Sequence, residues 1–155
     1  MVSPELLRRF PFFGFMSQPQ LNAVAMITNE VTFTQGDTIL EHGREAAALY
    51  LVIEGNVELY YIVTIENNPD YHKEYFVSEI NPGEIFGISA LIDPYIYTGN
   101  MKAGTDCRVL QTNAPSLRSL CHVDAKLAHG LMTEIAKAAM QRLADTRVLL
   151  VSARK

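Results

Sequence analysis

Residues 82–91 read Pro-Gly-Glu-Ile-Phe-Gly-Ile-Ser-Ala-Leu, and this stretch is the most informative part of the chain about its fold. Upstream of it, residues 49–59 read Leu-Tyr-Leu-Val-Ile-Glu-Gly-Asn-Val-Glu-Leu, with apolar side chains at alternate positions. Alternation with a period of two is typical of β-strands, and Glu54-Gly55-Asn56 predicts a hairpin turn between two of them. Further glycines separate similar runs, so we expect many short strands, as in a sandwich or jelly roll.

The chain on both sides of these strands carries helix signals instead. Ser3 and Pro4 are expected to open a first helix, and Ser17 to cap a second. Asp124 is expected to cap a long helix near the end of the chain. The predicted fold is a mainly β jelly roll with flanking helices. It forms a single domain over residues 1–155, made of N-terminal helices (1–28), a β-roll (29–113) and C-terminal helices (115–155). The last of these helices, at about 124–152, is the predicted dimerisation helix.

Charge and composition exclude several classes of partner. The 155 residues carry a formal net charge of −4, which is poorly suited to neutralising phosphates, so we expect no nucleic-acid binding by this chain alone. No apolar run approaches the roughly 18 residues of a membrane span. The N-terminus does not have the pattern of a secretory signal. We therefore expect a cytoplasmic protein with no membrane partner.

Residues that could hold a metal ion or act as nucleophiles are scattered along the chain. There is no His-x-His and no Cys-x-x-Cys, so the sequence predicts no metal site, no catalytic residues and no enzyme activity. The residues in question are His42, His72, His122, His129, Cys107 and Cys121.

The strand, glycine and 82–91 patterns together resemble the cyclic nucleotide-binding domain of the catabolite-activator and protein kinase A regulatory families. The phosphate cassette of that family reads roughly Phe-Gly-Glu-x-Ala-Leu, followed about ten residues later by Arg-Ser/Thr-Ala. Here Ile88 stands at the position of the glutamate, and the Arg-Ser pair falls on Tyr97-Thr98 or Thr98-Gly99. The frame of the cassette is present, but both of its charged ligands are absent.

The resemblance implies a ligand pocket inside the roll. A buried phosphate needs a cation and N–H donors, and Ile88 offers no acceptor to a ribose hydroxyl, so the cassette argues against cyclic AMP or cyclic GMP. No cofactor is assigned. Ile88, Tyr97 and Met101 predict a more apolar pocket than the family's. The site residues implied by the resemblance are Phe86, Gly87, Ile88, Ser89, Ala90, Leu91, Tyr97, Thr98, Gly99, Arg142 and Thr146.

Cations that could replace the missing arginine are few. Lys102 is the only one between Glu84 and Thr105, and it either reaches an anion or is a solvated surface residue. Arg142 and Thr146 lie one helical turn apart and therefore share a face. In the catabolite activator the corresponding arginine pairs with the cassette glutamate. Arg142 is left with three alternatives: an anionic ligand, an ion pair with Asp145 or Glu134, or the other subunit of a dimer.

The long helix has two apolar stripes. Leu131, Ile135 and Ala138 form one, suited to packing on the roll. The other has the alternating three- and four-residue spacing of a coiled-coil seam and predicts a homodimer, although a helix buried on two sides within one monomer fits the same spacing. The residues of this seam are Met132, Ala136, Ala139, Leu143, Thr146 and Leu150.

The sequence thus predicts a regulatory domain that senses a small-molecule ligand and dimerises through its long helix, in signal transduction or transcription regulation. Two alternatives remain open. The chain could be a dimerisation scaffold with no ligand, or the sensor half of an activator-type transcription factor.

Overall fold

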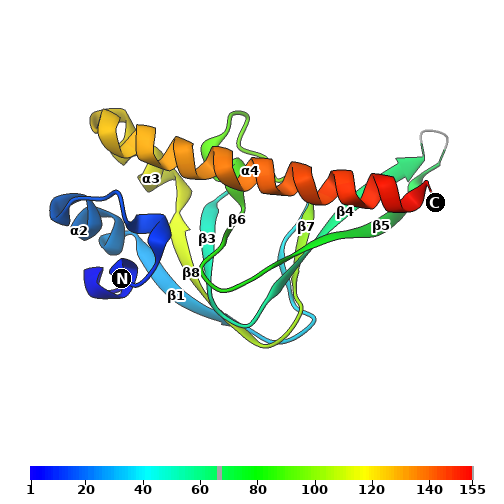
Figure 1. Ribbon diagram of the computed structural model, residues 1–155, viewed down its shortest axis with the longest axis horizontal. Coiled ribbons are helices and arrows are strands. Elements are labelled where there is room, and N and C mark those ends of the chain that lie inside the picture. The colour runs from blue at the N-terminus through cyan, green and yellow to red at the C-terminus, as the bar shows by residue number, and fades with distance from the viewer. Residues whose placement is uncertain (66–67, 155) are drawn as a thin grey trace.

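The computed structural model describes residues 1–65 and 68–154, with the side chains at 65–72 excepted. Two four-stranded antiparallel sheets face each other as a jelly roll, in the orders β1-β8-β3-β6 and β2-β7-β4-β5 (Figure 1). The predicted fold class is confirmed. The strands are β1 (Thr28–Phe33), β2 (Thr38–Leu40), β3 (Ala48–Glu54), β4 (Val57–Ile65), β5 (Asn68–Ile80), β6 (Ile85–Phe86), β7 (Asn100–Ala103) and β8 (Cys107–Asn113).

The turn at Gly55 does not form the predicted hairpin. It follows β3 and precedes β4, but β3 pairs with β6 and β8 while β4 pairs with β5 and β7. Gly55 therefore carries the chain from one sheet to the other. Its φ is +85°, and a Cβ there would lie 2.4 Å from the Asp106 carbonyl oxygen, so both conformation and space require glycine.

Helices cover one end and one side of the roll. They are α1 (Pro4–Arg8), the 3₁₀ turn η1 (Pro11–Phe13), α2 (Gln18–Met26), the 3₁₀ turn η2 (Ile88–Leu91), α3 (Ala114–Val123) and α4 (Ala125–Ala153). The predicted caps are confirmed, because Ser3 accepts from Leu6 N and Asp124 from Leu127 N. Ser17 forms a complete capping box with Gln20.

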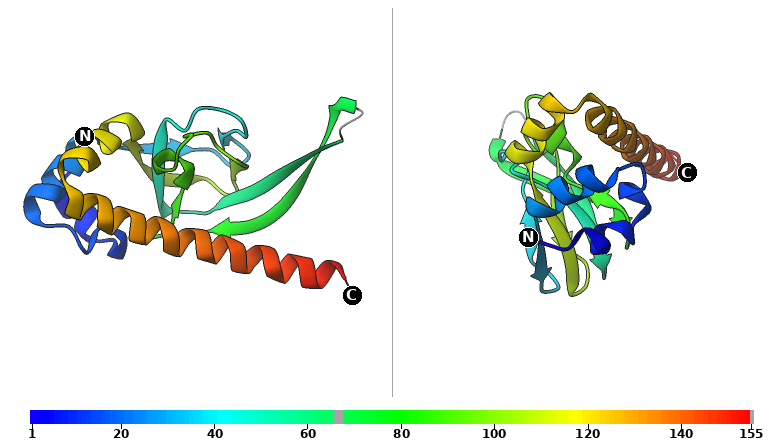
Figure 2. Two further views of the ribbon diagram at one scale, coloured as in Figure 1. Left: turned by 90° about the horizontal axis from the view of Figure 1, so that it is seen from above. Right: turned by 90° about the vertical axis from the view of Figure 1, so that its left-hand side faces the viewer.

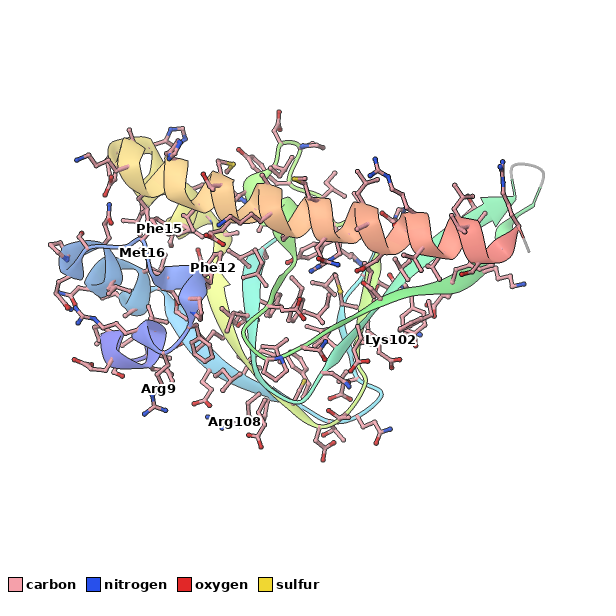
Figure 3. The ribbon with its side chains drawn as sticks, in the orientation of Figure 1. Arg9, Phe12, Phe15, Met16, Lys102 and Arg108 are labelled. Carbon is pink, nitrogen blue, oxygen red and sulfur yellow. The ribbon has the colours of Figure 1, made fainter. Side chains whose placement is uncertain are left out.

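The first half of α4 anchors that helix to the roll. Leu127, Leu131 and Ile135 are buried, and Ala138 packs against the same core, which confirms one of the two predicted stripes. Phe12, Phe15 and Met16 gather beneath this half of the helix (Figure 3). Gly130 leaves the space for the Phe15 ring, since a Cβ there would lie 2.0 Å from a ring carbon.

Beyond Ala138 the helix leaves the core. Its last turns and the long β4–β5 pair project from the same end of the roll, and Figure 2 shows that they diverge. The exposed large apolar side chains of this half include Met140, Val148 and Leu150. No helix in the described part of the chain is long and apolar enough to cross a membrane.

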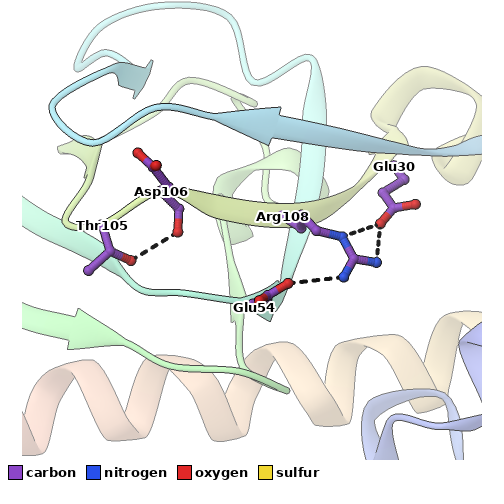
Figure 4. A network of polar contacts seen from close by, with 5 residues as sticks. All are labelled: Glu30, Glu54, Thr105, Asp106 and Arg108. Atoms are coloured by element: carbon purple, nitrogen blue, oxygen red, sulfur yellow. Dashed lines mark hydrogen bonds and ion pairs between the residues drawn. The ribbon is translucent and has the colours of Figure 1, made fainter.

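A polar network ties three strands of one sheet together on the outside of the roll. The Arg108 guanidinium on β8 bonds Glu30 on β1 through Nε (2.7 Å) and Glu54 on β3 through Nη1 (3.0 Å) (Figure 4). Both glutamates raise the pKa of Arg108. The network is exposed, so it contributes little to the stability of the fold.

Candidate functional site

A cavity of about 350 Å³ lies between α4 and the roll. One wall is the second half of α4, and the others are η2, the chain just before β7, and the inner faces of β2, β4, β5 and β7. Most of its surface is apolar. Its lining residues are Leu40, Leu59, Tyr61, Val77, Gly87, Ile88, Ser89, Tyr97, Thr98, Gly99, Met101, Ala139, Arg142, Leu143 and Thr146.

The cassette turns at Gly87, which is left-handed (φ +73°) and leads directly into η2. A Cβ at Gly87 would lie 3.2 Å from the Ala48 carbonyl oxygen, so the close approach to β3 also favours glycine. Ile88 and Ser89 then line the cavity. Of the other implied residues, Phe86 and Ala90 are fully buried and Leu91 is 7% exposed, and all three lie behind the cavity wall.

The segment before β7 brings Tyr97, Thr98 and Gly99 to the cavity. The Tyr97 hydroxyl donates to the Ala48 carbonyl at 2.6 Å and accepts from the Ala48 N–H at 3.3 Å. Burial raises the pKa of Tyr97 to about 12, so the hydroxyl stays neutral. Because the Tyr97 hydroxyl bonds the backbone of Ala48, it holds this wall of the cavity in place. Thr98, one of the two residues onto which the family's arginine could fall, is exposed and also lines the cavity.

Arg142 is the only charged side chain lining the cavity in the part of the chain that the structure describes. The guanidinium is half-buried, and its Nη2 donates to the Ile85 carbonyl at 2.7 Å. Desolvation lowers the pKa of Arg142, while the neighbouring Glu84 acts in the opposite direction. This guanidinium is therefore held in an apolar setting by one neutral acceptor.

The predicted ion pairs of Arg142 with Asp145 and Glu134 are both wrong. Asp145 accepts from the Gln141 side chain at 2.9 Å, and Glu134 faces Lys137 at 3.4 Å. No carboxylate in the described residues lies within 4 Å of the Arg142 guanidinium. An anionic ligand and a second subunit are the two alternatives that remain.

Lys102 does not reach the cavity. It lies 2.6 Å from Glu74 and 5.0 Å from the centre of the Tyr60 ring, in a separate surface depression that also holds Asn100. Thr98 and Met101 line the cavity instead, so Thr98, Asn100 and Lys102 do not share one face. The hypothesis that Lys102 meets a ligand there is wrong.

All six residues of the predicted α4 seam are exposed in the single chain. Three of them, Ala139, Leu143 and Thr146, also border the cavity. The Thr146 hydroxyl donates to the Arg142 carbonyl at 2.8 Å, within its own helix. Arg142 and Thr146 thus share the cavity face, one turn apart, as their spacing predicts.

Two groups of functional residues were missed in the sequence. Leu40, Leu59 and Val77 form much of the apolar lining, and the period-two alternation on β4 could have indicated that Leu59 and Tyr61 share an inward face. Arg118 gave no local signal. Its guanidinium on α3 donates to the Ala90 carbonyl at 2.6 Å and stacks 4.1 Å from the Tyr95 ring, which fixes the end of the cassette.

The cavity offers apolar packing, a few hydroxyls and one positive charge. Within the described ranges, no three His, Cys, Asp or Glu side chains are grouped so that they could hold a metal ion. The arrangement is therefore that of a binding pocket in which one cation orients a small molecule.

Comparison with known proteins agrees with this geometry. The chain is 36% identical to a cyclic nucleotide-binding protein of Geobacter metallireducens, with a TM-score of 0.79 over 92% of this chain and 99% of the other. It is 25% identical to the catabolite activator protein of Thermus thermophilus, with a TM-score of 0.68 over 92% of this chain and 63% of that one.

A curated relative is the CRP-like cAMP-activated global transcriptional regulator of Mycobacterium tuberculosis, 23% identical over 133 residues. The match covers 86% of this chain and 57% of the regulator, so the chain spans little more than half of that relative's length. The family model of the cyclic nucleotide-binding domain matches residues 30–124, from β1 to the start of α4. The chain therefore belongs to the cyclic nucleotide-binding domain family.

Proposed function

We propose that this chain is a regulatory ligand-sensing domain whose ligand occupies the cavity under α4 and acts by changing the position of that helix. The observation that carries the proposal is the cavity itself, about 350 Å³ with one wall made by a helix and the others by the roll. A ligand in such a place contacts two elements that can shift relative to each other. Its binding energy can therefore bias their arrangement.

The way α4 is attached supports this coupling. Its first half is fixed by the buried Leu127, Leu131 and Ile135. Its second half meets the roll largely across the cavity, and the Arg142 bond to the Ile85 carbonyl is its one side-chain hydrogen bond to the roll among the described residues. A rigid anchor followed by a weakly held arm is the arrangement that a hinge between the two halves requires.

The proposed ligand is not a cyclic nucleotide. The resemblance puts Ile88 at the position of the family's glutamate and Tyr97 or Thr98 at that of its arginine, and all three residues line the cavity. A cyclic nucleotide here would leave a ribose hydroxyl unpaired against Ile88, at a cost of about 1–3 kcal/mol. Its phosphate would also lack the bidentate cation of the cassette.

Native mass spectrometry tests the sensing function without assuming a ligand. The protein is incubated with the small-molecule fraction of a bacterial extract, alongside Ala139→Trp, which fills the cavity, and Ala144→Trp, which adds the same indole on the solvent side of α4. We expect one or more bound masses with the wild type and Ala144→Trp but not with Ala139→Trp. Spectra without any bound mass would instead favour a dimerisation scaffold.

The exposed apolar side chains of α4 support a homodimer in which two copies of this helix pair. Met132 is 38% exposed and Leu150 59% exposed, and both belong to the predicted seam. We expect Met132→Lys/Leu150→Lys to weaken dimerisation by roughly 1,000-fold or more, because each lost apolar contact contributes about 1.5–3 kcal/mol and occurs in both subunits. Light scattering coupled to gel filtration measures the change.

The matched control is Thr133→Lys/Val151→Lys, which adds the same charge one position further around the helix. This variant is expected to remain dimeric. A wild-type chain that runs as a monomer, or a control that dissociates as fully as the seam variant, would count against the α4 pairing. The curated relative's length and name support a second candidate: the sensor half of an activator-type transcription regulator, to which this dimer would also be suited.

A further inference from the structure

We infer that the cavity binds a small amphipathic carboxylate, with an apolar body against the roll and a carboxylate on Arg142. The inference rests on the proposed sensing function and names the chemical class of its ligand. It depends on three features: the hydrogen bonds of the Arg142 guanidinium, the composition of the cavity walls, and the Glu84 carboxylate near Arg142.

Most N–H donors of the Arg142 guanidinium have no hydrogen-bond partner among the described residues. An arginine carries five N–H donors in a planar fork, and here one of them donates to the Ile85 carbonyl at 2.7 Å. The remaining four have no hydrogen-bond partner among the described residues. A half-buried guanidinium in this state is best satisfied by a planar acceptor that takes two donors at once, and a carboxylate has that geometry.

The side chains of the cavity walls determine which kind of body the carboxylate ligand can have. Leu40, Leu59, Val77 and Met101 close one side, and Ile88 stands beside them. A ligand with many polar groups would lose its hydration without finding partners on these side chains. An aliphatic or aromatic body would instead bury its surface favourably. One polar end and one apolar body therefore match the two parts of the cavity.

The surroundings of Arg142 limit the charge of the ligand. Its guanidinium also borders a second groove, about 400 Å³, in which Glu84 lies. The Glu84 carboxylate accepts from the Asn81 N–H at 2.7 Å and stays close enough to influence Arg142 electrostatically. A single cation with a carboxylate nearby balances one negative charge better than two, which favours a monocarboxylate over a phosphate monoester.

Binding would also act on the helix. The donors that receive the ligand belong to the same side chain that ties the second half of α4 to β6. A carboxylate that draws the guanidinium toward the cavity competes with the Ile85 carbonyl for it. Arg142 would therefore both recognise the ligand's carboxylate and transmit its binding to α4.

Isothermal titration with defined probes tests the inference. The probes are 4-phenylbutanoate and octanoate, each beside its neutral amide, with cyclic AMP as a third chemistry. We expect both carboxylates to bind the wild-type protein roughly 10- to 100-fold more tightly than their amides, because charge-assisted pairs are the stronger hydrogen bonds. Cyclic AMP is expected to bind more weakly than either carboxylate.

Arg142→Gln should remove the preference for carboxylate over amide while leaving the amide affinity nearly unchanged. Arg147→Gln, an exposed charge on the same helix, should keep the preference. If Arg142→Gln does not fold, Ile88→Glu serves in its place, since a carboxylate on the cavity wall should reject the acids and spare the amides. Circular dichroism verifies the fold of each variant.

The outcomes separate the two proposals. Acids and amides that bind equally, or a preference that survives Arg142→Gln, would overturn the carboxylate inference. If neither acid binds but the wild type still retains an extract mass that Ala139→Trp loses, the ligand class is wrong and the sensing function stands. If neither the probes nor the extract yields binding, both proposals fail.

Discussion

Ile88→Glu combined with Thr98→Arg is expected to increase the affinity for cyclic AMP by roughly 100- to 10,000-fold, because each change restores one charge-assisted hydrogen bond of about 1.5–3 kcal/mol. The new guanidinium would meet the phosphate bidentately, and the new carboxylate would accept from the ribose hydroxyl. Both positions line the cavity, and Gly87 already makes the turn that leads into η2. Isothermal titration with cyclic AMP measures the gain.

The two changes are expected to act together. Ile88→Glu alone puts a carboxylate into the cavity that Arg142 also lines, but it supplies no cation at the position of the cassette arginine. Thr98→Lys combined with Ile88→Glu supplies the same charge without the planar fork, so it should gain less. A double variant that folds but binds cyclic AMP no better than the wild type would show that the cassette is placed wrongly on this sequence.

Gly55→Ala is expected to lower the free energy of unfolding by about 2–5 kcal/mol, the sum of left-handed strain and overpacking. The φ of Gly55 is +85°, and the added methyl would lie 2.4 Å from the Asp106 carbonyl oxygen and 2.8 Å from the Cys107 Cβ. Backbone atoms of β8 and its preceding turn cannot yield without disturbing the sheet. Urea denaturation followed by circular dichroism measures the loss.

Gly36→Ala separates the two contributions. Gly36 has nearly the same backbone angle, φ +91°, but nothing lies within 4 Å of its added methyl. It should therefore cost only the conformational part, about 1–2 kcal/mol. Equal losses at the two positions would mean that the crossing between the sheets tolerates the methyl, and that close packing at Gly55 adds nothing.

The cassette illustrates how far local sequence reasoning reached. The turn at Gly87 and the short η2 helix involve only residues within four positions of each other. Such local structure can be read from the order of the residues along the chain. The caps at Ser17 and Asp124 were predictable for the same reason. A cap or tight turn is closed by hydrogen bonds between near neighbours, and the identities of those neighbours are read directly from the sequence.

The hairpin predicted at Gly55 failed because turn chemistry does not specify which ladder a strand joins. A tight, glycine-containing turn occurs both in hairpins and between the sheets of a roll. The choice is made by distant pairings, here β3 with β8 and β4 with β7. The two alternatives for Lys102 stayed open for a related reason, because the face on which it lies depends on the register of β7 against β2 and β4, including an irregularity in the β2 pairing.

Strand periodicity, helix caps and glycine turns could be predicted from the sequence, because each is a property of residue identity at short spacing. Tertiary structure alone decided that Arg142 bonds the carbonyl of Ile85, 57 residues earlier in the chain, and that Arg118 holds Ala90. These contacts arise from the packing of α3 and α4 on the roll. The site's single cation and its apolar walls meet only when that packing closes the cavity.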